Sequence, residues 1–183
     1  MLITVTFKTF ADKGQMAMIK IGQRLPSTEV LWVTESNVET INLSQKLTGR
    51  RVAIFGMPGA FTDTCSELHV PNILGNKNDL LSIGVEEICI LTVNDPFVLK
   101  EWGRSKGIFK AGISLIGDAA SECTKSLGLN FTVPAIGLYD RSLRYAMLAD
   151  DGVVKQFLME ETQSEITTSG AEALIEAISK SKT

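Results

Sequence analysis

The sequence predicts one α/β domain built on a mixed β-sheet. Short apolar runs rich in β-branched residues, typical of buried strands, alternate along the chain with capped or amphipathic segments that are typical of helices. Near the C-terminus, the Asp-Gly pair at 151–152 separates two apolar runs, which indicates a β-hairpin. Alternation of strands and helices favours parallel strands, and the hairpin adds antiparallel ones, so we expect a mixed sheet.

In the N-terminal part, a long helix is expected from Cys65 to about Leu81. Pro71 would kink this helix, because proline removes a backbone donor and clashes with the preceding turn. The elements expected before it are an initial turn (18–26), strands at 30–33 and 38–41 that could form a hairpin, a polar connector that could form a helical turn (42–49) and a central buried strand (51–55).

In the C-terminal part, the last helix (170–179) carries apolar residues at 171, 174, 175 and 178, the spacing of one helix face. The elements expected before it are a buried strand (85–93), a helix opened by Asn94-Asp95-Pro96, a strand (113–116), a short helix from Asp118 to Leu127, and the two strands of the hairpin (142–149 and 153–159).

The composition is ordinary for a soluble globular domain. The chain has 183 residues, of which 44% are hydrophobic and 21% charged, and its net charge is −3. No basic field suggests nucleic acid or an anionic membrane, and no apolar run approaches the roughly 18–20 residues that span a bilayer. We therefore expect neither a nucleic-acid nor a membrane partner.

The stretch 55–71, FGMPGAFTDTCSELHVP, carries the chemistry. A glycine- and proline-rich loop follows a buried strand, and Thr62, Asp63 or Thr64 could cap the helix that comes next. Cys65 is then expected in the first turn, where unpaired N–H groups and the helix dipole favour a thiolate, the nucleophilic form of cysteine. From cysteine statistics alone, a buried structural residue is the alternative.

Pro58-x-x-x-Thr62-x-x-Cys65 matches the signature of the peroxiredoxins, peroxidases that work through a cysteine. The longer run 58–66, with His69 after it, resembles the type II, or peroxiredoxin-five, subfamily. The resemblance covers the chain from about residue 19 to its end. It implies a single thioredoxin-like domain, in which helices flank a central mixed sheet that begins with an N-terminal β-hairpin.

The resemblance also implies a role for each matched residue. Cys65 would be the peroxidatic nucleophile, which becomes a sulfenic acid. Thr62 would hydrogen-bond the peroxide, since its hydroxyl both donates and accepts, and capping the helix is compatible with that role. Pro58 would shape the loop and shield the thiolate, with Gly59 in support. Arg144, ahead of the Asp-Gly hairpin, would stabilise the thiolate and the transition state, and neither a bound cofactor nor a metal is implied.

For each of three nearby residues, two interpretations remain open. His69, four residues after Cys65, could tune the pocket or serve as a hydrogen-bonded structural residue. Arg141 follows an expected turn and is interpreted as solvated or supporting. Asp63 stands where the subfamily usually has a neutral residue, and its charge could disfavour the thiolate while favouring the helix N-terminus.

The chain lacks an evident resolving cysteine near its C-terminus. Some subfamily members carry one there, but the segment 165–170 has none, and Thr168 is the closest match. The resemblance therefore implies a one-cysteine mechanism reset by an external thiol, either glutathione with glutaredoxin or thioredoxin. Cys89 is expected in the core and could resolve Cys65 only after local unfolding, and Cys123 is expected to be packed.

Residues 1–18 match nothing in the family, so we divide the chain into an extension of unknown role (1–18) and the peroxiredoxin domain (19–183). The extension has no charged start and no clear cleavage site, which disfavours a secretory signal, and it lacks the arginine typical of mitochondrial transit peptides. It could form an extra strand, or translation could start at Met16 or Met18.

We therefore expect a cytoplasmic thiol peroxidase for hydrogen peroxide and small alkyl hydroperoxides, acting in antioxidant defence and cell redox homeostasis, with organellar import left open. Three widely spaced cysteines fit a reducing compartment. The resemblance also implies a homodimer, with Phe61, Phe97 and Trp102 as interface or core residues. The alternatives are a peroxide sensor or holdase that uses Cys65 without efficient turnover, and a thiol-disulfide exchanger.

Overall fold

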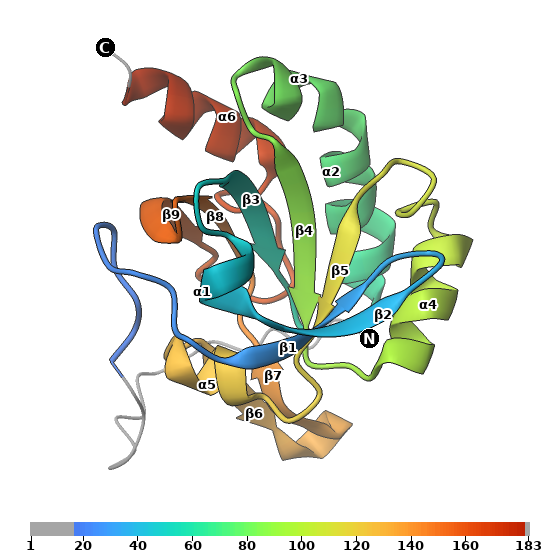
Figure 1. The fold of residues 1–183 in the computed structure, drawn as a ribbon. Coiled ribbons are helices and arrows are strands. Elements are labelled where there is room, and N and C mark those ends of the chain that lie inside the picture. The colour runs from blue at the N-terminus through green and yellow to red at the C-terminus, as the bar shows by residue number, and fades with distance from the viewer. Residues whose placement is uncertain (1–16, 182–183) are drawn as a thin grey trace.

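Seven strands form the main sheet of the computed structural model, which describes residues 17–181 (Figure 1). They are β1 (Glu29–Val33), β2 (Val38–Asn42), β3 (Arg51–Gly56), β4 (Glu87–Thr92), β5 (Ser114–Gly117), β8 (Tyr145–Asp150) and β9 (Val153–Met159). Their order across the sheet is β2-β1-β5-β4-β3-β8-β9. The strands β3, β4 and β5 are parallel, and the other pairings are antiparallel. The predicted mixed sheet and N-terminal hairpin are confirmed.

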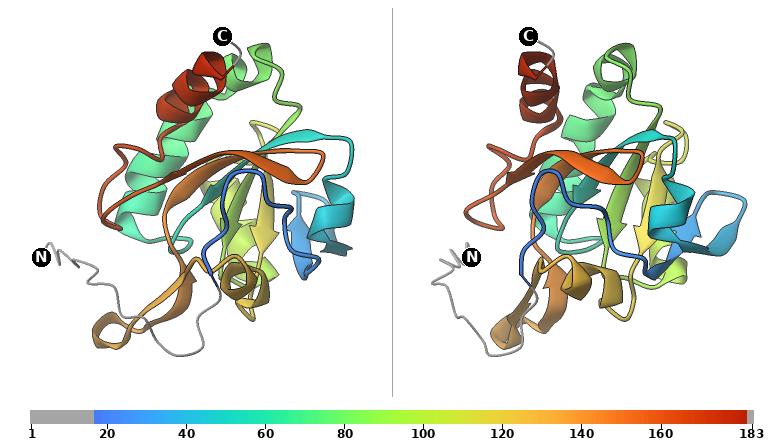
Figure 2. Two further views of the ribbon diagram at one scale, coloured as in Figure 1. Left: turned by 90° about the vertical axis from the view of Figure 1, so that its left-hand side faces the viewer. Right: turned by 60° about the vertical axis from the view of Figure 1, so that its left-hand side comes forward.

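Helices cover both faces of this sheet (Figure 2). On one face lie α2 (Val70–Gly75), α3 (Lys77–Ser82), α4 (Pro96–Ser105) and α6 (Ala171–Lys180); on the other lie α1 (Leu43–Lys46) and α5 (Glu122–Ser126). Alternate residues of β3 enter the two cores: Ala53 and Phe55 pack on the first face, Val52 and Ile54 on the second. Cys65 belongs to the first core and Cys89 to the second.

Local signals place several elements as predicted. The Asp95 side chain accepts hydrogen bonds from the backbone N–H groups of Phe97 and Val98, which caps α4. Asp151 and Gly152 have φ of 51° and 70°, the left-handed conformation that a two-residue hairpin turn requires between β8 and β9. The final helix, α6, is also confirmed.

The helix after Cys65 differs from the prediction of one kinked helix up to Leu81. It consists of a π-helical turn, η1 (Thr64–His69), followed by α2 and then, after a break at Asn76, by α3. Pro71 lies in the first turn of α2, where its missing N–H disturbs no α-helical ladder. At the break, Asn76 has φ of −102° and ψ of 7°, and its side-chain amide donates to the carbonyl of Asn72.

Other predictions need correction in the C-terminal half. The short helix α5 begins at Glu122 rather than Asp118, because the Asp118 carboxylate accepts from the N–H groups of Cys123 and Thr124 and thus stands ahead of it. A second, two-stranded sheet of β6 (Asn130–Val133) and β7 (Leu138–Ser142) was not predicted; a short 3₁₀ helix, η2 (Pro134–Ile136), joins its strands.

The β6–β7 hairpin lies against α5, apart from the main sheet (Figure 1). It changes the place of two predicted residues. Arg141, expected after a turn, is part of β7, although Asp140 before it keeps a turn-like φ of 47°. Ser142 ends β7, so β8 starts only at Tyr145, and Arg144 immediately precedes that strand instead of lying within it.

The proposed N-terminal extension, 1–18, lies almost wholly outside the described residues. Within residues 17–181, no helix has the length and apolar character needed to cross a membrane.

Candidate active site

Cys65 lies where the parallel strands end. β3 stops at Gly56, a loop covers 57–63, and Cys65 follows in the first turn of η1 with a fully buried side chain. The neighbouring Ser66 is fixed as well, because the indole N–H of Trp102 donates to its hydroxyl at 3.0 Å. Asp63, in contrast, is exposed and makes no capping hydrogen bond through its side chain.

Arg144 is the cation at Cys65. Its Nη2 atom donates a hydrogen bond to the Cys65 sulfur at 3.3 Å, and the arginine itself is only 1% exposed. The Arg144 guanidinium thus lies directly beside the sulfur in a buried site, where charges interact more strongly than in water. The structure thus brings together the two residues that the family resemblance paired.

His69 lies in η1 together with Cys65, and its side chain contacts Arg144. Its Nδ1 atom lies 3.0 Å from Nη1 of Arg144, and its Nε2 atom lies 3.0 Å from the carbonyl oxygen of Ser169. Because a guanidinium only donates, Nδ1 must accept, and Nε2 carries the proton that is donated to Ser169. Burial, with the nearby Arg144 charge, lowers the pKa of His69 from 6.5 to about 3, so this histidine is neutral at physiological pH.

The segment after β9 also holds Arg144 through hydrogen bonds. The carbonyl oxygen of Gln163 accepts from Nη2 at 2.8 Å and from Nε at 3.2 Å, and its side-chain oxygen accepts the Arg144 backbone N–H at 2.6 Å. The backbone N–H of Glu160 donates to the Arg144 carbonyl at 3.0 Å. These contacts leave the guanidinium little freedom to turn away from the sulfur.

The loop before Cys65 is fixed by polar contacts. The Thr62 hydroxyl donates to the Gly59 carbonyl at 2.9 Å, and Nη1 of Arg141 donates to the buried Pro58's carbonyl at 3.2 Å. The Asn94 side chain accepts from the N–H of Ala60 at 2.9 Å. Arg141 is therefore a supporting residue of the loop.

Position 59 requires a glycine, because the side chains of Arg141 and Asn94 pack close to its backbone. A Cβ atom there would come within 2.5 Å of Nη1 of Arg141 and within 3.2 Å of the Asn94 side-chain oxygen. A side chain would displace both groups that hold the loop.

The other cysteines lie apart from this site. Cys89 and Cys123 are free, fully buried and packed in the core on the opposite face of the sheet. Burial, with the neighbouring Glu87 charge, raises the pKa of the Cys89 thiol far above its usual value, and burial raises the pKa of Cys123 to about 12. Both are thiols at neutral pH.

The three aromatic residues that were expected at an interface or in the core differ in their burial. Trp102 is fully buried and belongs to the core, so it contributes to no surface. Phe61 and Phe97 are 52% and 83% exposed.

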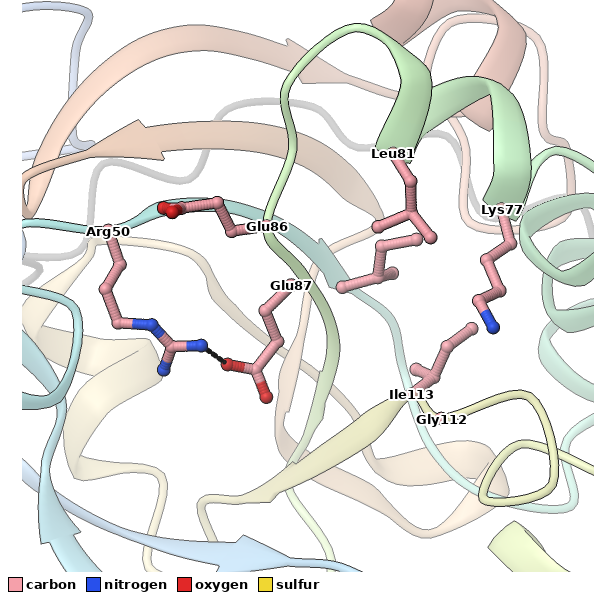
Figure 3. A pocket seen from close by; sticks show the side chains of 8 residues that line it. Arg50, Lys77, Leu81, Glu86, Glu87, Gly112 and Ile113 are labelled. Carbon is pink, nitrogen blue, oxygen red and sulfur yellow. Dashed lines mark hydrogen bonds and ion pairs between the residues drawn. The ribbon is translucent and has the colours of Figure 1, made fainter.

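A cavity of about 340 Å³ lies at the other end of the sheet (Figure 3). It is bordered by Arg50, Glu87 and Ile113, which stand where β3, β4 and β5 begin, whereas Cys65 follows the end of β3. An Arg50–Glu87 ion pair spans part of it. The cavity shares no lining residue with the Cys65 site, and we assign it no role in catalysis. Within residues 17–181, no group of three or more His, Cys, Asp or Glu side chains is placed to hold a metal ion.

Comparison with known proteins agrees with the geometry. The Redoxin family matches residues 20–175. Peroxiredoxin-2C of Arabidopsis thaliana is 37% identical over 164 residues, 89% of this chain and 100% of the relative, and the chloroplastic Peroxiredoxin-2E-2 of Oryza sativa subsp. japonica is 36% identical over 167 residues, 89% of this chain and 74% of the relative. Reduced Prx3 of Vibrio vulnificus in complex with hydrogen peroxide superposes with a TM-score of 0.82 at 33% identity, covering 90% of this chain and 99% of that one.

This chain belongs to the peroxiredoxins. It is therefore a thiol peroxidase, an oxidoreductase that needs no prosthetic group, and its thioredoxin-like fold is as predicted.

Sequence analysis missed three residues of this peroxiredoxin's site. Ser169 contributes a backbone carbonyl, which any residue type can supply, so its identity gave no signal. Gln163 contributes a backbone carbonyl and a side-chain oxygen, but a glutamine in a polar segment does not indicate such contacts. Glu160 is an acidic residue directly after an apolar strand and before a Ser/Thr-rich segment, a pattern that could have indicated a buried carboxylate with local donors.

Proposed function

We propose that this peroxiredoxin reduces hydrogen peroxide and small alkyl hydroperoxides through Cys65 as the peroxidatic nucleophile. The observation that carries the proposal is the 3.3 Å contact between the buried Cys65 sulfur and Nη2 of Arg144. The relative from Vibrio vulnificus, described in its reduced form with hydrogen peroxide, supports that substrate.

In the proposed reaction, the Cys65 thiolate attacks one peroxide oxygen. The sulfur–oxygen bond forms as the O–O bond breaks, and hydroxide, or alkoxide from an alkyl hydroperoxide, leaves and takes up a proton. Sulfur loses two electrons and Cys65 becomes a sulfenic acid. Negative charge grows on the leaving oxygen, so the site has to supply donors there.

Arg144 and Thr62 are suited to hold the peroxide. The contacts with Cys65, His69 and Gln163 occupy four of the five N–H groups of the guanidinium, and the remaining one, on Nη1, can donate to the leaving oxygen. The Thr62 hydroxyl already donates to Gly59, so its lone pairs can accept the peroxide O–H. Pro58 and Gly59 shape the loop that places Thr62.

An external thiol, from glutathione with glutaredoxin or from thioredoxin, resets the enzyme. One thiol displaces water from the sulfenic acid to give a mixed disulfide, and a second releases the Cys65 thiolate while the two external sulfurs join. The placement of Cys89 supports this, because that thiol is buried in the opposite core and has a raised pKa. Cys89 could act only after a large local opening.

The test is steady-state consumption of hydrogen peroxide with glutathione plus glutaredoxin, and separately with thioredoxin. We expect sustained turnover with at least one system, unchanged in Cys89→Ser. Consumption of one equivalent followed by arrest in both systems would favour the sensor or holdase. Loss of turnover in Cys89→Ser would exclude reset by an external thiol alone.

We also propose a homodimer that pairs through the surface around the Cys65 loop. Two exposed aromatics flank this surface, Phe61 in the loop and Phe97 in the first turn of α4. Asn94 links the two elements through Ala60. Exposed aromatics favour burial in an interface. Sedimentation equilibrium should show a dimer that Phe97→Asp converts to monomer, and a wild-type monomer would contradict the proposal.

A cytoplasmic location remains part of the proposal. Three free, buried cysteines suit a reducing compartment. Relatives are named for chloroplast and mitochondrion, so a fluorescent fusion of the full chain should be followed in cells, and signal in an organelle would contradict it.

A further inference from the structure

Glu160, the residue after β9, carries a buried carboxylate whose hydrogen bonds go to the segment that follows it. Its side-chain oxygens accept four hydrogen bonds from one short segment: from the N–H groups of Thr168 (2.8 Å) and Ser169 (2.7 Å) and from the hydroxyls of Thr167 (2.8 Å) and Ser169 (2.9 Å). Glu160 itself is only 3% exposed. A carboxylate surrounded by so many donors holds them in a fixed arrangement.

These hydrogen bonds close the segment 160–169 on itself, and both of its ends reach the site. At the first end, the Glu160 N–H and the Gln163 carbonyl hold Arg144. At the other end, the Ser169 carbonyl accepts from Nε2 of His69 and thereby fixes the tautomer that accepts from Arg144. One carboxylate therefore ties together the two groups of contacts that orient the guanidinium.

We propose that Glu160 is a positioning residue for the Cys65 thiolate, which acts by closing the segment 160–169 and so orienting Arg144 and His69. The inference rests on the proposed role of Cys65 as the nucleophile. Glu160 acts through its neighbours rather than on the sulfur itself.

The charge of Glu160 and its geometry act in opposite directions on the thiolate. Burial alone would raise the pKa of Glu160, but the hydrogen bonds from Ser169, Thr167 and Thr168 outweigh it and lower that pKa, so the group is ionised at neutral pH. A negative charge disfavours a nearby thiolate. Removing the charge would therefore stabilise the thiolate if only long-range electrostatics mattered, whereas losing the positioning of Arg144 would destabilise it.

The experiment compares Glu160→Gln with the matched control Glu161→Gln, whose side chain is exposed. Two quantities are measured in the full chain: the pH profile of Cys65 alkylation by iodoacetamide, followed by peptide mass spectrometry, and the single-turnover rate with hydrogen peroxide. For Glu160→Gln we expect a profile moved to higher pH and a peroxide reaction slower by about tenfold or more. Glu161→Gln should match the wild type. A Glu160→Gln profile that is unchanged or moved to lower pH would overturn the proposal.

A second variant covers the case in which Glu160→Gln does not fold. Thr167→Val removes one donor to Glu160 from an exposed position and should move the alkylation profile in the same direction by a smaller amount. If Glu160→Gln does not fold and the alkylation profile of Thr167→Val is unchanged, Glu160 has a structural role only and the proposal is overturned. If wild-type Cys65 is not the residue that peroxide oxidises, the proposed function fails, whatever the Glu160 variants show.

Discussion

Nδ1 of His69 accepts a hydrogen bond from Nη1 of Arg144 at 3.0 Å, so a neutral imidazole stands beside the cation of the site. The ring also packs edge-on against Phe55, with centroids 5.7 Å apart. Protonation of His69 would remove the acceptor and place two positive charges in contact within a buried site. His69 is therefore a hydrogen-bonded structural residue that also orients Arg144, which joins the two interpretations that the sequence left open.

Because His69 is neutral beside Arg144, we predict that the folded protein loses stability in acid. The unfolded chain takes up a proton on His69 below pH 6.5, whereas the folded chain does so only near pH 3, so the stability from this group is complete above pH 6.5 and falls as the pH drops towards 3. At about pH 4.5, this group lowers the free energy of unfolding by about 2–3 kcal/mol relative to neutral pH. Urea unfolding at neutral and acidic pH should show a weaker pH dependence in His69→Gln than in the wild type; parallel profiles would contradict the neutral histidine.

Arg144→Lys tests geometry at constant charge. Lysine cannot reproduce the planar fork that bonds Cys65, His69 and Gln163 together. We expect the second-order rate of peroxide reduction to fall about 10²-fold or more. Stopped-flow tryptophan fluorescence measures this rate, and Arg104→Lys, an exposed residue of α4, is the control. Equal rates in both variants would show that charge alone suffices.

Thr62→Val should lose the acceptor that we assign to the peroxide. The variant keeps the shape of the side chain but not its hydroxyl, so a rate loss of about 10²-fold is expected, while Thr62→Ser should retain most activity. Single-turnover kinetics over a range of peroxide concentrations provide the comparison. If valine and serine behave alike, the hydroxyl serves only the loop.

Gly59→Ala probes the loop. Its Cβ would push away Arg141 and Asn94, breaking contacts to the Pro58 carbonyl and the Ala60 N–H. Because the clash involves mobile side-chain ends, we expect a stability loss of only about 1 kcal/mol together with a higher KM for peroxide.

Gly75→Ala, at the end of α2, is the control for Gly59→Ala. Apart from its chain neighbours and the backbone of its own helix, no atom lies within 4 Å of the added Cβ there, so stability should be unchanged or rise by up to about 1 kcal/mol, with normal kinetics. A normal KM in Gly59→Ala would show that the loop contacts do not matter.

Local chemistry explains which parts of the structure were predictable. The Asp95 cap and the Asp151-Gly152 turn depend on neighbouring residues, and both appear as expected. The pairing of Cys65 with Arg144 came from the family resemblance, since 79 residues separate them. The carbonyl that fixes His69 is also remote, 100 residues away in Ser169, and belongs to a residue type with no chemical signature for that role.

Misplaced elements have equally local causes. The π-helical turn and the break at Asn76 depend on small differences in backbone hydrogen bonding that apolar spacing does not reveal. The β6–β7 hairpin was missed because Pro134 lies between its strands and the Tyr139-Asp140 pair indicated a turn, so the residue pattern did not suggest two strands.

The most direct test of the account is the single-turnover reaction with hydrogen peroxide in two variants, Cys65→Ser and the double variant Cys89→Ser/Cys123→Ser. Sulfenic acid is trapped and located by peptide mass spectrometry. We predict no reaction in the first variant and the wild-type rate with one sulfenic acid at Cys65 in the second, because Cys65 is the cysteine whose sulfur contacts Arg144. A residual fast reaction in Cys65→Ser, or its loss in the double variant, would contradict Cys65 as the sole peroxidatic residue.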